Sequence, residues 1–193
     1  MPLLARSDAS DRVPMTEPAE KPAIRLWTPQ GFREDDWRHA ETADALAGNG
    51  RFILPLAAVA AMEPDTRRLA KERLGVLLMP GEPVEKILPF LDSLSLVALS
   101  FPAFNDGRSF SKAELLRSRH NFGGGLRAVG QVLVDQLPHM LRLGFDEFEV
   151  SHPVLIERLE KGQAGGIALH YQPTSKPADR EGQKYSWRRT RKP

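Results

Sequence analysis

The sequence contains no cysteine among its 193 residues. A chain without thiols forms no disulfide bond, thiolate nucleophile, cysteine zinc site or iron–sulfur cluster on its own ligands. A metal site would therefore need histidine and carboxylate ligands, and the five histidines show no H-E-x-x-H spacing. From these absences we expect neither a metal nor another cofactor.

Long hydrophobic runs are also missing. The longest one, Phe52 to Met62, is about half as long as a transmembrane helix requires. The first six residues, MPLLAR, lack the apolar centre of a signal peptide. We therefore expect a cytoplasmic protein that does not associate with membranes.

The common nucleotide-binding and hydrolase motifs are absent as well. The chain has no G-x-x-x-x-G-K-[ST] phosphate loop, no G-x-G-x-x-G fingerprint and no G-x-S-x-G elbow. The run Gly123–Gly125 follows an expected helix, whereas a dinucleotide fingerprint follows a strand, so we interpret this run as a linker.

Basic charge is concentrated at the C-terminus. The last ten residues carry five basic side chains and no acidic one, although the net charge of the whole chain is only +2. The rest of the chain is therefore slightly acidic, which argues against a nucleic-acid-binding domain, because such domains carry a basic patch on the fold. We interpret the basic end as a solvated terminus. Contact with an acidic partner, RNA or an anionic surface is the alternative.

Proline and polar residues divide the chain into three parts. Residues 1–22 and residues 173–193 contain several prolines and little hydrophobic periodicity, and we expect both tails to be disordered. Residues 23–172 contain clustered hydrophobic residues in a length that suits a single domain.

Short apolar runs alternate with helical patterns inside this domain. This alternation predicts the α/β class, with a mostly parallel sheet built from repeated βα units and right-handed crossovers. An open layered sheet and a partial barrel both fit the pattern. The expected strands cover residues 24–28, 52–56, 75–79, 94–101, 126–129, 148–150 and 167–171, and the expected helices cover residues 64–74, 83–92, 111–119, 135–143 and 152–161.

Two loops follow expected strands at the carboxyl edge of the sheet, where ligands bind in such folds. We expect their polar residues to form a crevice: Asn105, Asp106 and Gly107 from the first loop, and Gly130, Gln131, Asp135 and Gln136 from the second. Gly107 is free to adopt a positive φ in the turn. Guanidinium and ammonium groups bind oxyanions, so five basic residues are candidate ligands for a small anion: Arg108, Lys112, Arg117, Arg119 and Arg127.

Several of these residues also have a plain structural interpretation. Arg108 could pair with Asp106 or Glu114, and Asp135 could cap the helix that follows it. Ser111 and Glu114 have the spacing of a capping box, which would begin a helix at Ser111. Arg117 and Arg119 cannot face the same way on one helical turn.

Four motifs in this order resemble a bacterial family of uncharacterised proteins. They are F-P-x-F-x-D-G-R at 101–108, L-L-R-x-R at 115–119, L-R-A-V-G-x-V-L-x-D-Q-L at 126–137 and G-F-D-x-F at 144–148, and the resemblance is best from Gly75 to Val150. The genes of this family commonly lie beside the sulfite reductase gene in assimilatory sulfate reduction clusters. The resemblance therefore implies a pathway and a partner, sulfite reductase. Gln131 stands where the family usually has aspartate, which argues against a catalytic carboxylate there.

Two hypotheses from different functional classes follow. The first is an accessory protein of assimilatory sulfite reduction that assists sulfite reductase by protein contact or by anion binding. The second is a small enzyme that acts on an anionic substrate in the crevice, with Asp106 or Asp135 as the acid–base group. A structural or RNA-binding role of the basic tail is a third alternative, and the sequence leaves the oligomeric state open.

Overall fold

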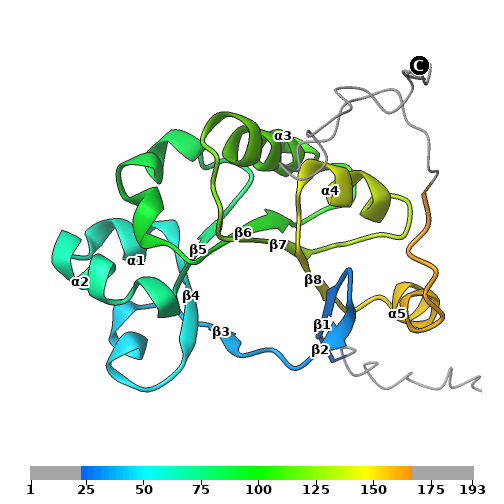
Figure 1. Ribbon diagram of the computed structural model, residues 1–193, viewed down its shortest axis with the longest axis horizontal. Coiled ribbons are helices and arrows are strands. Elements are labelled where there is room, and N and C mark those ends of the chain that lie inside the picture. The colour runs from blue at the N-terminus through cyan, green and yellow to red at the C-terminus, as the bar shows by residue number, and fades with distance from the viewer. Residues whose placement is uncertain (1–22, 167–193) are drawn as a thin grey trace, which may run out of the picture.

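The computed structural model describes residues 23–166, which form one curled sheet covered by helices (Figure 1). The eight strands lie in the order β2-β1-β8-β7-β6-β5-β4-β3. From β3 to β8 every neighbouring pair is parallel, whereas β1 is antiparallel to both β2 and β8. The strands are β1 (Arg25–Thr28), β2 (Gly31–Arg33), β3 (Trp37–His39), β4 (Arg51–Pro55), β5 (Leu74–Leu78), β6 (Leu96–Phe101), β7 (Gly125–Gly130) and β8 (Glu147–Val150).

The helices lie mainly on the convex face of the sheet, where Figure 1 shows α1 to α4. They are α1 (Leu56–Ala61), α2 (Pro64–Leu69), α3 (Arg108–Glu114), α4 (Leu137–Leu143) and α5 (Pro153–Glu160). A π-helical turn, Leu115–Arg119, continues α3, and 3-10 turns cover Ala43–Ala47, Lys71–Arg73, Val84–Lys86 and Leu88–Ser93.

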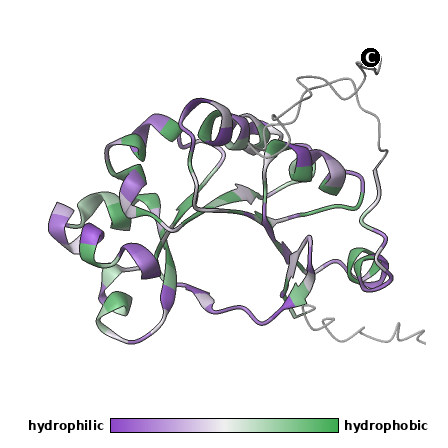
Figure 2. Ribbon diagram, in the orientation of Figure 1, coloured by the Kyte–Doolittle hydropathy of each residue, from purple (hydrophilic) through white to green (hydrophobic). Residues whose placement is uncertain are grey.

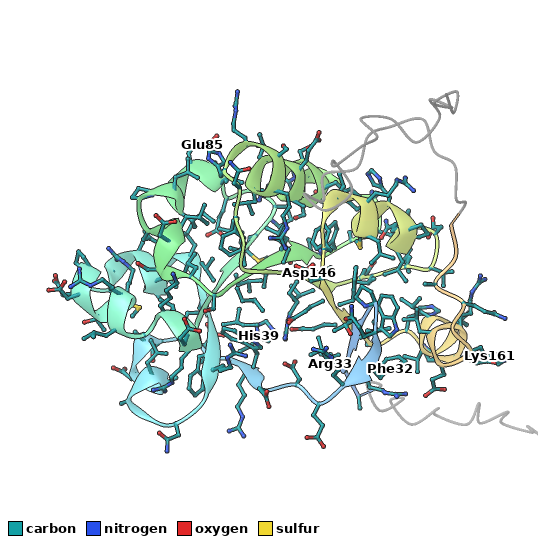
Figure 3. All side chains as sticks on the ribbon, in the orientation of Figure 1. Phe32, Arg33, His39, Glu85, Asp146 and Lys161 are labelled. Atoms are coloured by element: carbon teal, nitrogen blue, oxygen red, sulfur yellow. The ribbon has the colours of Figure 1, made fainter. Side chains whose placement is uncertain are left out.

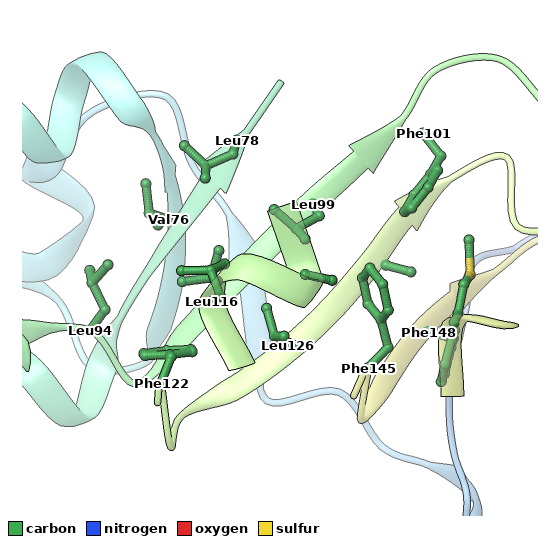
Figure 4. Close-up of a cluster of buried hydrophobic side chains, with 14 of the residues drawn as sticks. Val76, Leu78, Leu94, Leu99, Phe101, Leu116, Phe122, Leu126, Phe145 and Phe148 are labelled. Carbon is green, nitrogen blue, oxygen red and sulfur yellow. The ribbon is translucent and has the colours of Figure 1, made fainter. Parts of the chain in front are cut away.

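The main hydrophobic core fills the space between these helices and the convex face. Leu99 and Phe101 of β6 point into it, together with Leu116 and Phe145 (Figure 4). All six residues of β6 are buried, because this central strand is covered on both faces. Figure 2 shows the resulting pattern, with hydrophobic colour along the central strands and hydrophilic colour on the outer sides of the helices.

The concave face is closed by a short connection between the two edge strands. Residues 34–36, which we call the strap, join β2 at one edge to β3 at the other. Four extended residue steps span at most about 14 Å, so the strap forces the sheet to curl until its edges almost meet. A small apolar cluster that includes Trp37, Ile53 and Leu96 fills part of this concave space. The α/β class and the mostly parallel sheet are thus confirmed, in the form of the partial barrel.

Several local predictions were wrong. The helix expected over 64–74 ends at Leu69, and a separate 3-10 turn covers Lys71–Arg73. The helix expected from Ser111 already begins at Arg108, because the Asp106 carboxylate accepts the Arg108 backbone N–H at 3.3 Å. The helix expected over 83–92 consists of 3-10 turns.

Other elements were not predicted at all. They are the three-residue strands β2 and β3 and the helix α1, which takes up the apolar run after β4. The strand expected over 167–171 lies outside the described residues, and so do both predicted tails, residues 1–22 and 173–193.

Candidate functional site

The carboxyl edge of β5 to β8 is the candidate site, because four connecting loops meet there. Gly130, the last residue of β7, allows the ends of β6 and β7 to lie close together. Its φ is +95°, and a Cβ at this position would lie 2.5 Å from the Phe101 carbonyl oxygen. The next residue, Gln131, donates its backbone N–H to the same oxygen at 2.7 Å. Only glycine allows this approach, which holds the two predicted crevice loops side by side.

Asp106 and Arg108 form a bidentate ion pair on this edge. The Arg108 Nε and Nη2 atoms donate to the two Asp106 carboxylate oxygens at 2.9 and 2.7 Å. The hydrogen bond from Arg108 lowers the pKa of the Asp106 carboxyl, and Asp106 in turn raises the pKa of Arg108. Asp106 therefore stays ionised, which makes it a poor proton donor at neutral pH.

Lys112 is buried under the same edge. Its Nζ donates to the Met79 carbonyl oxygen at 2.5 Å. Burial lowers the pKa of the Lys112 amine, and Glu82 partly opposes this effect. Lys112 thus ties α3 to the loop after β5. In the same way, Gln136 Nε2 donates to the Phe104 carbonyl oxygen at 2.8 Å and ties the loop after β7 to the loop after β6.

The remaining predicted crevice residues surround these contacts. Asn105, Gly107, Gln131 and Asp135 are exposed at the surface. Gly107 precedes α3 with a φ of −85°, so the turn does not use the positive φ that glycine permits. The helix α4 begins after Gln136, and no side chain caps it, so Asp135 does not act as its cap.

Arg117 lies at the opposite, amino edge of the strands. Its guanidinium donates to the backbone carbonyl oxygens of Gly144 at 3.0 Å and Gly124 at 2.8 Å, and it also contacts the Phe122 carbonyl and the Asp146 carboxylate. Burial lowers the pKa of Arg117, which Asp146 partly restores. This arginine therefore holds together the chain segments that enter β7 and β8.

Arg127 lies on the concave face, where it is fully buried. Its guanidinium donates to Asp35 of the strap at 2.8 and 2.9 Å, to Glu147 at 2.8 Å and to Glu149 at 3.2 Å. Burial disfavours the charge, but the hydrogen bonds and the charges of Asp35 and Glu147 outweigh burial and raise the pKa of Arg127.

His39 extends this cluster across the concave space. Its Nε2 lies 2.7 Å from the Glu149 carboxylate, although β3 and β8 are separated by four strands in the sheet. Figure 3 shows His39 on the side of the sheet away from α3 and α4. The hydrogen bond to Glu149 raises the pKa of His39, and burial partly opposes it. We call Asp35, His39, Arg127, Glu147 and Glu149 the concave ion cluster.

The five candidate anion ligands are therefore spread over four places. Arg108 and Lys112 share the carboxyl edge, Arg117 lies at the amino edge, and Arg127 lies on the concave face. Arg119 is exposed on the π-helical turn. The structure brings only the first two together, and both already have partners.

Sequence reasoning missed Met79 and Phe104, the two large apolar side chains exposed on the carboxyl edge. Met79 ends the strand expected over 75–79 and Phe104 lies in the loop after the strand expected over 94–101, and this placement was the available signal. It also missed the acidic members of the concave ion cluster. Glu147 and Glu149 alternate with Phe148 and Val150, which indicates a strand with one polar face.

A family model described as a bacterial protein of unknown function (DUF934) matches residues 75–180. The chain belongs to this family. The DUF934 match begins within β5, so it contains Arg127 and both glutamates of the concave ion cluster, whereas Asp35 and His39 precede it. The candidate carboxyl edge lies entirely within the DUF934 region.

Among curated proteins, none matches the chain. No helix in residues 23–166 has the length and apolar character needed to cross a bilayer. Within the same residues, no group of three or more histidine, aspartate or glutamate side chains is arranged to hold a metal ion.

Proposed function

We propose that this protein is an accessory protein of assimilatory sulfite reduction and that it assists sulfite reductase by direct protein contact. The gene neighbourhood of the family that the motifs resemble supports a shared pathway. The carboxyl edge of the half-barrel supplies the contact surface, because it combines exposed apolar groups with an exposed arginine.

Two exposed side chains carry this proposal. Met79 after β5 is 44% exposed, and Phe104 after β6 is 64% exposed. Both lie in loops whose backbone carbonyl oxygens are held by side chains, Lys112 and Gln136, so the loops present them in a defined position. Methionine, phenylalanine and arginine are enriched in protein interfaces, and Arg108 lies on the same edge.

The polar groups of this edge favour contact over acid–base chemistry. The Asp106 carboxylate is engaged by Arg108, which lowers its pKa, and the Lys112 amine is bound to a carbonyl oxygen. An acid–base group works best with a pKa near the working pH and with a free path to the substrate. The edge thus resembles a binding surface with its charges already paired.

A binding measurement with purified sulfite reductase tests the proposal. We expect Phe104→Ser and Met79→Ser each to weaken the Kd by tenfold or more, because buried anchor side chains dominate interface energies. Leu69→Ser is the matched control, since Leu69 is 86% exposed but lies on α2, away from the carboxyl edge. Titration calorimetry gives the Kd of the unmodified protein and of the three variants. Unchanged affinity of both edge variants, or no binding by the unmodified protein, would refute the contact.

Growth of a deletion strain on different sulfur sources tests whether the protein acts in sulfite reduction. We expect a strain without the gene to fail on sulfate and on sulfite but to grow on sulfide and on cysteine. Complementation with the Phe104→Ser gene should restore growth poorly, and complementation with the Leu69→Ser gene should restore it fully. Normal growth of the deletion strain on all four sulfur sources would contradict the pathway assignment.

A further inference from the structure

A cleft of about 370 Å³ opens beyond the carboxyl ends of β7 and β8, between the loops that lead into α4 and α5 (Figure 1). Residues 130–133 form one wall and residues 151–153 the other. The carboxyl ends of adjacent parallel strands are the usual place for a ligand in such sheets, and a cleft of this volume suits a small molecule. The cleft is separate from the proposed contact surface, because neither Met79 nor Phe104 lines it.

Both walls of the cleft are held in place by the fold. In the loop after β7, the Val132 backbone N–H donates to the Gly130 carbonyl oxygen at 3.0 Å, and the Val132 side chain is buried in the main core. In the loop after β8, the His152 carbonyl oxygen accepts the Ile156 backbone N–H at 3.0 Å. The cleft is therefore formed before any ligand arrives, as small-molecule sites usually are.

Three polar side chains line the cleft without serving the fold. Gln131, Ser151 and His152 supply a carboxamide, a hydroxyl and an imidazole. Within residues 23–166, no side-chain hydrogen bond or ion pair engages any of the three. The edge of β5 and β6 differs in this respect, because Asp106 and Lys112 already have partners there. The polar groups of the cleft are thus available to a ligand.

The lining also determines which charge a ligand can carry. None of the described residues that line the cleft is aspartate, glutamate, lysine or arginine. A charged ligand would lose hydration here without gaining an opposite charge, which is costly. Leu133 and Pro153 offer apolar contacts, and the Gln131 carboxamide both donates and accepts hydrogen bonds. These groups together complement an uncharged molecule that has an apolar body and an amide.

We propose that this cleft binds an uncharged small molecule that combines an apolar ring with an amide-type group, and that Gln131 and Ser151 are its hydrogen-bond partners. The small anion that the sequence led us to expect in the crevice is disfavoured at this position. The inference is independent of the proposed function, because its test involves no sulfite reductase.

NMR titrations of the full chain with three probes test the charge and the location. Benzamide has the proposed chemistry, benzoate is its charged analogue of similar shape, and inorganic sulfate has no apolar body. We expect benzamide to bind roughly tenfold more tightly than benzoate, or better, and sulfate not to bind. The chemical-shift changes should centre on the backbone N–H groups of Gly130, Gln131 and Ser151. Tighter binding of benzoate, shift changes centred elsewhere, or no binding of benzamide would overturn the inference.

Two variants test the assigned hydrogen-bond partners. Gln131→Leu and Ser151→Ala each remove one polar group, and we expect each to raise the benzamide Kd about three- to tenfold. Gln30→Leu is the matched control, since Gln30 is exposed in the turn between β1 and β2 and does not line the cleft. Its benzamide Kd should equal that of the unmodified protein. Melting temperatures show whether each variant is folded, and equal Kd values for the three folded variants would contradict the assignment.

Discussion

At the residue scale, Arg127 is the side chain on which the concave face depends most. It is fully buried and forms ion pairs with three carboxylates that come from the strap and from β8. We expect Arg127→Met to lower the free energy of unfolding by about 3 kcal/mol, because the buried Glu149 and the partly buried Glu147 lose their guanidinium partner. Urea unfolding measures the change. A loss below about 1 kcal/mol would show that water solvates the three carboxylates freely.

Arg108→Ala is the matched control for this prediction. The Arg108–Asp106 pair has comparable geometry, but the Arg108 side chain is 63% exposed. Solvent screens exposed ion pairs, so we expect the urea midpoint of this variant to remain unchanged.

His39 makes stability depend on pH. The hydrogen bond to Glu149 raises its pKa above the usual 6.5. A group with a raised pKa in the folded state contributes stability that is fully present below its unfolded pKa and is lost as the pH rises through its folded pKa. We therefore expect His39→Gln to destabilise the protein more at pH 5.5 than at pH 8.5, measured by urea unfolding at both values. An equal effect at both pH values would mean that His39 does not titrate against Glu149.

At the element scale, the pairing of β6 with β7 relies on Gly130. An added Cβ would meet the Phe101 backbone at 2.5 Å, and the φ of +95° disfavours any other residue. We expect Gly130→Ala to cost roughly 2–4 kcal/mol through strain and overpacking. Gly81→Ala should leave stability unchanged, because nothing lies within 4 Å of that position. Thermal unfolding of the two variants gives the comparison, and equal melting temperatures would contradict it.

Local sequence patterns predicted a helix or strand well where the residues of that element alone determine its bounds. β6 is an uninterrupted apolar run because both of its faces are covered, and α4 ends at Gly144, which adopts φ +93°. The start of α3 was missed because a side chain outside the helix, Asp106, binds its first N–H group. The strands β2 and β3 are too short to show any periodicity.

The candidate site was predicted only in part, for a similar reason. The carboxyl-edge loops could be located, since strand ends are visible in the sequence. The partners of the arginines could not, because Arg127 binds Asp35 across 92 positions and Arg117 binds Asp146 across 29. No spacing rule connects residues at such separations, so the sequence did not show that the five candidate arginines and lysines lie in four separate places.

At the scale of the whole molecule, the family region does not contain the complete half-barrel. A fragment that starts at residue 75 would lack β1 to β4, the strap and Asp35. It would expose one edge of β5 and leave Arg127 without one of its carboxylates. We expect such a fragment to lack a cooperative thermal transition by circular dichroism. A sharp transition near that of the full chain would instead mark residues 75–193 as an independent folding unit.

The pairing of β1 with β8 also has a consequence for synthesis on the ribosome. The hairpin β1–β2 emerges first, but Leu26 of β1 is paired with Glu149 of β8, which is made more than a hundred residues later. At roughly 5–20 residues per second, the hairpin waits on the order of ten seconds for its partner strand. The neighbouring strands from β3 onward pair in the order of their synthesis. During translation the half-barrel would therefore grow from β3, while Leu26 and Trp27 remain available to a chaperone until β8 leaves the exit tunnel.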